Sequence, residues 1–247
     1  MGSTRIQYLA HATFKIITPE SRVIIVDPWF TGNDFIRPED RVQERVDLFL
    51  VTHGHDDHFD PKLPDLIRAT GAKVVANNIC RFDLINNGVP SDSIEPLNLG
   101  GTIGLLGVQV SMVQAFHLSH ITTEKEEMTL PHQAVGFVLH LSDGVRIYFA
   151  GDTGIFGDMK LIGDIYKPTI AVLPIGDRYT MGALEASYAV RLIGAPHLIP
   201  CHYGTFSSLA AGPEAFIERT KDIPNLQIHA LRPGETLDCS EIVGIAV

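Results

Sequence analysis

The sequence predicts a protein of the α/β (α+β) class, in which two packed β-sheets are covered by helices. Short segments that are β-branched-rich or alternate between apolar and polar residues fill the N-terminal third of the chain. Helix-like and strand-like segments alternate after residue 158, an order typical of sheets covered by helices. No compositional linker divides the sequence, so we expect residues 1–247 to form a single domain.

Within the N-terminal third, turn residues separate three short segments, 5–9, 13–18 and 22–26, which we predict to be strands. Residues 31–46 are polar and broken by Gly32 and Pro38, which indicates a loop. Residues 47–51 form a continuous apolar run, as buried strands do. A helix over 61–69, a strand over 73–76 and a helix over 80–87, ended by Gly88, complete this part.

The middle of the chain is expected to hold strands over 107–115, 134–141 and 145–150. Asp143-Gly144 between the last two is a strong signal for a hairpin turn. Beyond it we predict helices over 158–165, 183–193 and 213–221, alternating with strands over 170–173, 197–199 and 226–230.

The densest group of polar residues follows the predicted strand 47–51. It places three imidazoles and two carboxylates within seven positions, Thr52-His53-Gly54-His55-Asp56-Asp57-His58. Such hydrated groups at the end of a buried strand need something to hold them, and a divalent cation does so. His53 and His55 are spaced to reach one ion, whereas Asp57 and His58 can turn toward a second. Imidazole and carboxylate suit Zn, Mn, Fe or Ni.

Other apolar strands also end abruptly in His or Asp. These residues are His117, Asp152, Asp177 and His202. Ligands at the ends of neighbouring strands converge on one edge of a sheet sandwich, where rigid strands fix their geometry and loops admit substrate.

The composition limits the classes of partner. The chain has 19 Lys and Arg against 29 Asp and Glu, a formal charge of −10, which repels phosphate backbones and makes nucleic acid a poor partner. No apolar run approaches the length of about 20 residues that spans a bilayer. Three scattered cysteines do not make a disulfide framework. We therefore expect a cytoplasmic protein that acts on a small molecule, without a membrane.

These motifs resemble the metallo-β-lactamase superfamily, whose pattern is T-H-x-H-x-D-H followed by a third His, a Gly-Asp and a final His, each at a strand end. Further segments resemble its uncharacterised metal-dependent hydrolase branch, which is similar to the bacterial lactonase that opens L-ascorbate 6-phosphate. They are Leu9-Ala10-His11-Ala12, Val26-Asp27-Pro28, Ala150-Gly151-Asp152-Thr153-Gly154, residues 157–163, and Leu173-Pro174-Ile175-Gly176-Asp177. The resemblance covers essentially the whole chain.

The resemblance implies a four-layer αββα sandwich that holds two divalent metal ions per chain, with Zn favoured and Mn, Fe or Ni as alternatives. It assigns His53, His55 and His117 to one ion, assigns Asp57, His58 and His202 to the other, and makes Asp152 a bridge. Leu118 follows His117 where the branch tends to have a small polar residue, so His120 is an alternative third imidazole. Enzymes that resemble this chain often assemble, which leaves a homo-oligomer as an alternative.

Several other residues are candidates for substrate contact or for supporting the ligands. His11 lies in the turn between the first two strands, and Asp27 ends its own strand, where a carboxylate can fix the tautomer of a ligating imidazole. Asp177 and Thr180 follow another strand and can line the pocket, although Thr180 can equally cap the next helix. Asp56 should point away from Asp57 and is expected to be a turn residue.

We therefore expect a dinuclear hydrolase that cleaves an ester, lactone, amide or phosphoester bond of a small substrate, neutral or anionic, by attack of a metal-bound hydroxide. Asp57 would orient the attacking water and partly neutralise the ions. Two alternatives stay open at this point. One is a phosphodiesterase or nuclease of the same superfamily, and the other is a metal-binding regulatory protein without turnover.

Overall fold

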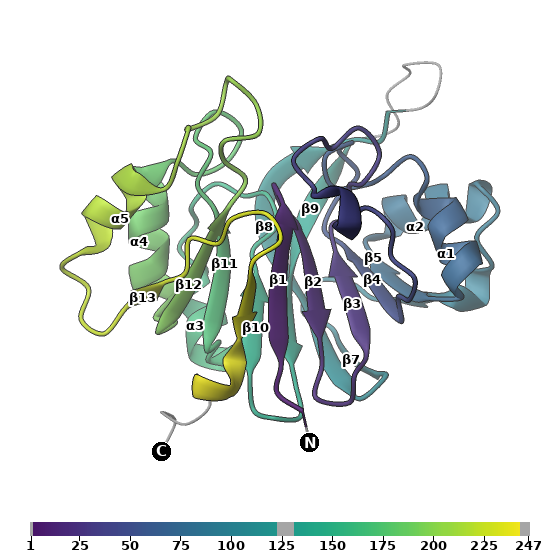
Figure 1. Cartoon of the computed structure of the whole chain (residues 1–247), viewed down its shortest axis with the longest axis horizontal. Coiled ribbons are helices and arrows are strands. Elements are labelled where there is room, and N and C mark those ends of the chain that lie inside the picture. Colours follow the sequence, from purple (N-terminus) through teal and green to yellow (C-terminus); the bar gives the residue numbers. More distant parts are fainter. Residues whose placement is uncertain (1, 123–130, 243–247) are drawn as a thin grey trace.

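Two seven-stranded sheets pack face to face in the computed structural model, which describes residues 2–122 and 131–242 (Figure 1). The strand order is β14-β1-β2-β3-β4-β5-β6 in the first sheet and β13-β12-β11-β10-β9-β8-β7 in the second. Both sheets are mixed. The pairs β3/β4, β4/β5 and β5/β6 are parallel, as are β10/β11, β11/β12 and β12/β13, while the other neighbours are antiparallel.

The strands of the first sheet come mainly from the N-terminal part of the chain. They are β1 (Arg5–Ala10), β2 (Thr13–Ile17), β3 (Val23–Val26), β4 (Leu48–Val51), β5 (Lys73–Ala76), β6 (Ile94–Pro96) and β14 (Thr236–Asp238). The second sheet consists of β7 (Thr102–Leu105), β8 (Val108–Ser119), β9 (His132–His140), β10 (Arg146–Phe149), β11 (Ile170–Pro174), β12 (His197–Cys201) and β13 (Gln227–Ile228).

Helices lie outside both sheets. The helices α1 (Leu63–Thr70) and α2 (Asn78–Asn86) lie beside the first sheet, whereas α3 (Met159–Tyr166), α4 (Ala183–Ile193) and α5 (Glu214–Thr220) cover the second (Figure 1). Asn77 caps α2, because its side chain accepts hydrogen bonds from the backbone N–H groups of Ile79 and Cys80. The expected αββα order of layers and the α/β class are thus confirmed.

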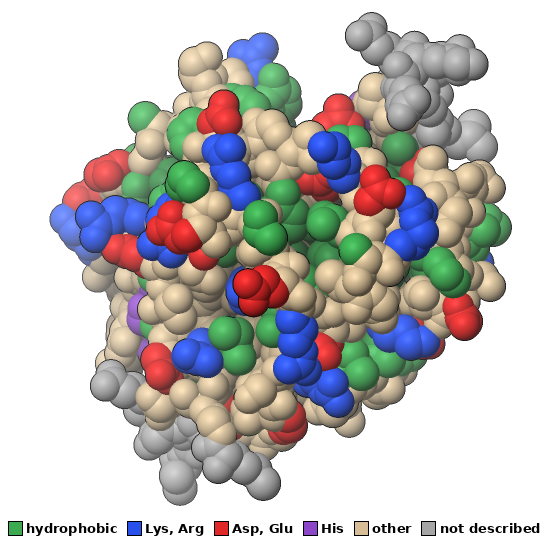
Figure 2. Space-filling model, turned by 45° about the vertical axis from the view of Figure 1, so that its right-hand side comes forward, with side chains coloured by type: hydrophobic (Ala, Val, Ile, Leu, Met, Phe, Trp, Pro, Cys, Tyr) green, Lys and Arg blue, Asp and Glu red, His purple; other side chains and the backbone are tan. Residues whose placement is uncertain are grey.

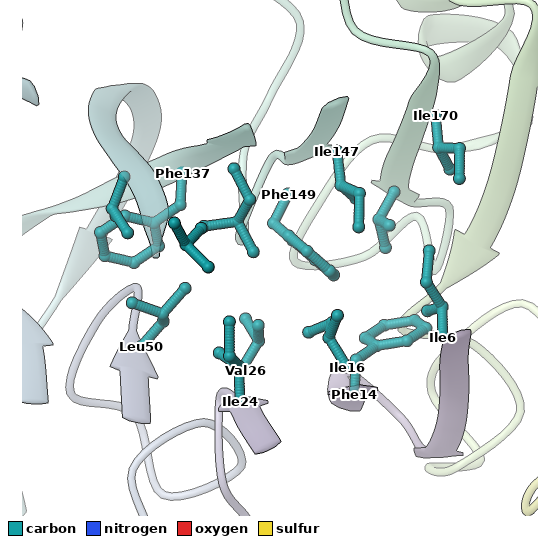
Figure 3. Packing of buried hydrophobic residues seen from close by; sticks show 14 of the residues in the cluster. Ile6, Phe14, Ile16, Ile24, Val26, Leu50, Phe137, Ile147, Phe149 and Ile170 are labelled. Carbon is teal, nitrogen blue, oxygen red and sulfur yellow. The ribbon is translucent and has the colours of Figure 1, made fainter. Parts of the chain in front are cut away.

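Three apolar clusters correspond to the three interfaces between layers. The cluster between the sheets brings Phe14, Val26 and Leu50 of the first sheet against Phe137 and Phe149 of the second (Figure 3). A second cluster packs α1 and α2 on the outer face of the first sheet, and a third packs α3, α4 and α5 on the outer face of the second. Burial of these side chains is the main force that holds the layers together.

Some boundaries differ from the predicted ones. The strand predicted over 107–115 continues as β8 to Ser119, so His117 lies inside a strand, at a register shift between Gln114 and Leu118. The strands β6, β7 and β14 were not predicted, because each is short and edge-located or weakly apolar. The hairpin predicted at Asp143-Gly144 is confirmed.

The three cysteines are buried and form no disulfide bond. Basic and acidic side chains are interspersed over the face shown in Figure 2. None of the helices in the described part of the chain is long and apolar enough to cross a membrane.

Candidate metal centre

Polar side chains from both sheets meet at one edge of the sandwich. The parallel strands β3 and β4 end there in Asp27 and in the loop that begins with Thr52. The parallel strands β10 and β12 of the other sheet are followed by Asp152 and His202. His11 comes from the turn between β1 and β2, and His117 comes from β8.

Three imidazoles form one group of possible ligands. Nε2 of His53 lies 3.1 Å from Nδ1 of His55, which lies 3.2 Å from Nε2 of His117. An ion that binds nitrogens at about 2.0–2.1 Å in tetrahedral geometry holds them about 3.3–3.4 Å apart. The spacing of the three nitrogens therefore fits a metal ion of the size of zinc.

A second group contains Asp57, His58, His202 and His11. Oδ2 of Asp57 lies 3.1 Å from Nε2 of His11 and 3.7 Å from Nε2 of His202. Oδ1 of the same carboxylate lies 3.9 Å from Nε2 of His58. His11 was expected near the site without a defined partner, and in the structure it contacts Asp57.

Asp152 lies between the two groups. Its Oδ2 is 3.8 Å from Nε2 of both His53 and His117, and 3.2 Å from Nε2 of His202. Its Oδ1 is 3.3 Å from Nε2 of His58. A single carboxylate thus lies within 3.8 Å of ligand atoms in both groups.

Asp27 orients two of the histidines from behind. Its carboxylate accepts a hydrogen bond from Nδ1 of His58 at 2.9 Å and two from Thr52, one from the backbone N–H and one from the hydroxyl, each at 2.8 Å. Because the Thr52 hydroxyl donates to Asp27, it accepts from Nδ1 of His53 at 2.9 Å. Both rings then keep an unprotonated Nε2 that faces the site.

The buried atoms at the centre are left without proper hydrogen bonds. Nε2 of His58 and Oδ1 of Asp152 are both buried and have no hydrogen-bond partner within the described residues, although they lie 3.3 Å apart. When the His58 ring is neutral and carries its proton on Nδ1 toward Asp27, these two atoms are both acceptors. A cation between them satisfies both, so the residues present fit a bound metal.

Burial keeps three of the imidazoles neutral. It lowers the pKa of His53 well below its usual value, lowers the pKa of His55 to about 4, and also lowers the pKa of His117. At neutral pH these rings are therefore in the unprotonated form that ligates metals.

At His58 and at the carboxylates, neighbouring charges outweigh the effect of burial on the pKa. Burial alone lowers the pKa of His58, but Asp152, Asp57 and Asp27 raise it well above its usual value. Burial raises the pKa of Asp57 and of Asp152, yet the neighbouring histidines hold both below the usual range. Without a metal, the negative charge of the site draws a proton to His58, which is the place a cation would take.

The backbone at the site is strained at three residues that carry side chains. His11, Asp27 and His202 have φ angles of 57°, 47° and 57°, in the left-handed region that favours glycine. Each immediately follows a strand and turns its side chain toward the cluster. Such strain costs about 1–3 kcal/mol per residue and concentrates at functional sites.

Four candidate residues neither belong to the converging groups nor form a hydrogen bond with their members within the described residues. The His120 ring lies 4.9 Å from that of His55, but of the two imidazole candidates only His117 belongs to a group of converging ligand atoms within the described residues. Asp56 also stays apart from these groups. Asp177 and Thr180 make a turn of their own, and Gly182 rather than Thr180 precedes α4 as its cap.

Three contacts of the site were not predicted from the sequence. Thr52 links Asp27 to His53, and Thr205 lies 2.9 Å from Nδ1 of His11. Trp29 stacks on Phe206, with ring centroids 5.8 Å apart, and both rings lie edge-on to the ring of His11. Thr52 opens the His-rich motif, but nothing in the sequence links position 205 to position 11.

Comparisons with known proteins agree with this arrangement. Residues 5–202 match the family model described as a beta-lactamase superfamily domain. The chain is 45% identical over 241 residues to a UPF0173 metal-dependent hydrolase of Rubrobacter xylanophilus, covering 96% of this chain and 97% of the relative. It is 40% identical over 240 residues to a UPF0173 metal-dependent hydrolase of Chloroflexus aurantiacus, covering 94% and 96%.

A solved structure shows the same similarity. The chain superimposes with a TM-score of 0.80 on a metallo hydrolase from the hyperthermophilic archaeon Ignicoccus hospitalis, at 29% sequence identity. The match covers 95% of this chain and 97% of the archaeal one.

Proposed function

This chain belongs to the β-lactamase superfamily and is a metal-dependent hydrolase, and from that premise we propose that it binds two divalent ions and cleaves an ester, lactone, amide or phosphoester bond of a small substrate. The first ion would be held by His53, His55 and His117, and the second by Asp57, His58 and His202. Asp152 would bind both.

The position of Asp152 is the observation that carries this proposal. Its two oxygens face histidines of both groups at 3.2–3.8 Å. A zinc ion in a protein usually takes about four ligands, so one ion would leave several of these seven donors unused. Two ions that share Asp152 use all of them, which supports a dinuclear centre.

When bound, divalent ions at such a centre lower the pKa of a coordinated water to about 7 and polarise the oxygen of the group that is cleaved. The chain's own residues prepare the site for this chemistry. Burial lowers the pKa of His11 to about 4, so the ring is neutral at pH 7 and donates from Nε2 to Asp57. Thr205 in turn donates to Nδ1 of His11. This chain of hydrogen bonds holds the carboxylate of Asp57, which in this proposal would orient a water.

The charge balance favours a substrate with negative charge. Asp57 and Asp152 bring two negative charges among the histidines, which is fewer than the four positive charges of two divalent ions. An anionic group on the substrate, such as the phosphate of a phosphorylated lactone or ester, would be attracted to the remaining charge.

Metal content per chain tests the dinuclear centre. Protein purified without chelator should contain about two ions per chain by elemental analysis, and His55→Ala and His202→Ala should each retain about one. His229→Ala is the matched control, because His229 pairs with His197 and belongs to neither group. One ion in the wild-type protein, or no loss in either variant, would refute the proposal of two ions.

Activity should then be measured with the identified metal on aryl esters, lactones, amides and bis-aryl phosphates. Turnover of any of the first three, lost in Asp152→Ala, supports the proposed hydrolase. Turnover restricted to bis-aryl phosphates would narrow the proposed hydrolase to a phosphodiesterase. Metal retention without turnover of any substrate would favour a regulatory metal-binding protein.

A further inference from the structure

A cavity lies at the edge of the second sheet that is opposite to the metal cluster. Its volume is about 380 Å³, and it is formed by the last turns of α3 and α4, the loops that follow them, and the start of β10. Thr169 and Pro196, which precede β11 and β12, belong to the lining, whereas the other end of β12 leads into His202 of the metal cluster. The volume falls within the range of about 300–1,000 Å³ that small-molecule sites occupy.

The lining of this cavity is strongly cationic. It includes four basic side chains, Arg146, Lys160, Lys167 and Arg191, and a single acidic one, Asp164. The formal excess is therefore three positive charges, in a chain whose net charge is −10. This concentration attracts anions to a protein that otherwise repels them.

Two of the four cations already have partners. Lys160 forms an ion pair with Asp164, and Arg191 binds both carboxylate oxygens of Asp222 at 2.6 and 2.8 Å. These pairs connect residues within α3 and join α4 to the segment after α5, so they are explained by the fold.

Arg146 and Lys167 have no such explanation. Neither side chain forms an ion pair or a hydrogen bond with another residue in ranges 2–122 and 131–242. Nε of Arg146 is buried and lacks a hydrogen-bond partner there. Solvent does not reach Nε, so an anion in the cavity would be bound by the other guanidinium N–H groups of Arg146 and by the Lys167 amine, for which the described residues supply no acceptor.

The backbone of Lys167 gives a second, independent indication. Lys167 ends α3 with a φ of 47°, in the left-handed region, whereas α1 and α4 end in Gly71 and Gly194 with φ of 67° and 70°. Glycine avoids strain at this position, and lysine does not. A residue that breaks a local rule without a structural gain often serves a function.

A simpler explanation is that the cations neutralise the carbonyl groups at the ends of α3 and α4. This accounts for Lys167 and Arg191, which lie at those ends. It does not account for Arg146, which begins a strand and whose guanidinium group has no ion pair within the described residues.

We propose that this cavity is a second ligand site, distinct from the metal centre, and that it binds a small organic anion through Arg146 and Lys167. The guanidinium group offers parallel N–H donors to a phosphate or a carboxylate, and the lysine amine adds a point charge. The volume leaves room for a ligand larger than inorganic phosphate.

Nuclear magnetic resonance of the zinc-loaded protein can locate binding directly. Glucose 6-phosphate and succinate serve as phosphate and carboxylate probes, and glucose as the uncharged control. Either anion should shift the backbone amide signals of residues 164–169 and 191–196 in a saturable manner, while glucose should not. Stronger binding of one probe tells which anionic group the site prefers.

Variants then test the two side chains. Lys167→Gly and Arg146→Gln should each weaken binding at this site by at least about tenfold, because each removes a charged hydrogen-bond donor. Lys167→Gly also relieves the left-handed backbone, so its urea midpoint should not fall, and lost binding cannot be ascribed to unfolding. Lys62→Gln, an equal loss of charge at the start of α1, should change nothing.

Three results would overturn the proposal. They are shifts confined to the loop 52–58 at the metal centre, shifts that do not saturate with either anion, and equal weakening by Lys62→Gln. The first result would assign anion binding to the metals. Either of the other two would show that the cations only neutralise the carbonyl groups at the ends of α3 and α4.

Discussion

Asp27 Oδ2 lies 2.9 Å from Nδ1 of His58, and both side chains are buried. This contact determines which nitrogen of the ring carries the proton, and it leaves Nε2 free to face Asp152. Since Asp27 also reaches His53 through Thr52, one carboxylate from β3 sets the protonation of two rings in the loop after β4.

Asp27→Asn should therefore weaken metal binding without removing a ligand. An amide lacks the negative charge that favours the Nδ1–H form of His58, and loss of such an outer partner typically costs about 10–100-fold in metal affinity. Competition with a chromophoric chelator measures the change. Asp177→Asn is the matched control, because Asp177 belongs to none of the converging groups. Equal affinities in the two variants would contradict the orienting role of Asp27.

His11→Asn should lower turnover while metal content stays the same. Asn tolerates the φ of 57° at this position, so the backbone is preserved while Asp57 loses the hydrogen bond from His11. A catalytic group that is no longer held in place costs up to about a hundredfold in rate. Steady-state kinetics and elemental analysis on the same samples check this. A loss of metal instead of rate would make His11 a ligand.

Gly176→Ala should destabilise the fold at the metal centre. A Cβ on Gly176 would lie 2.1 Å from the backbone oxygen of His202 and 3.1 Å from its Nδ1, so either the β11 end or His202 must move. Overpacking of this kind costs about 1–3 kcal/mol. Urea denaturation measures it, with Gly104→Ala as the control because a Cβ at position 104 meets nothing within 4 Å. Equal stability of both variants would show that the backbone around His202 can move to accommodate the added Cβ at no cost.

The metal-free protein should lose stability as the pH falls from about 6.5 to 4. Burial lowers the folded-state pKa of His11 and of His55 to about 4, and that of His53 well below its usual value. Between pH 6.5 and 4 the unfolded chain therefore binds more protons than the folded one.

The raised pKa of His58 does not reverse this trend, because its contribution is already complete below the unfolded-state value and is lost only as the pH rises through the folded-state value. Urea denaturation of chelator-treated protein at pH 7, 5.5 and 4.5 tests the direction. An increase in stability as the pH falls from 7 to 4.5 would contradict the conclusion that these buried imidazoles are neutral.

Much of the fold could be predicted because its signals are local. The apolar run 47–51 and the segment 73–76 became the neighbouring parallel strands β4 and β5. Short edge strands such as β6 and β14 carry little pattern of their own and exist through pairing with a neighbouring strand, which for β14 is β1, at the other end of the sequence. The extension of β8 past His117 depends on its long pairing with β9, which also lies beyond a local pattern.

The candidate site divides in the same way. The His-rich loop after β4 and the residues that follow β10 and β12 are visible as polar residues after apolar runs. The contact of Thr205 with His11 spans 194 positions, and the pairing of Asp57 with His11 depends on how two loops of the first sheet meet. Such contacts arise from tertiary packing, so no spacing of residues in the sequence predicts them.

The pairing of β14 with β1 has a consequence for how the protein is made. Arg5, Ile6 and Gln7 pair with Asp238, Leu237 and Thr236, so β1 acquires this neighbour only after the chain has been synthesised through residue 238. Until then a nascent chain presents an unpaired sheet edge, the kind of surface on which chains aggregate. We expect the first sheet to be complete only after residue 238 has left the ribosome, and a chaperone that binds the chain before that point would meet a sandwich still open at β1.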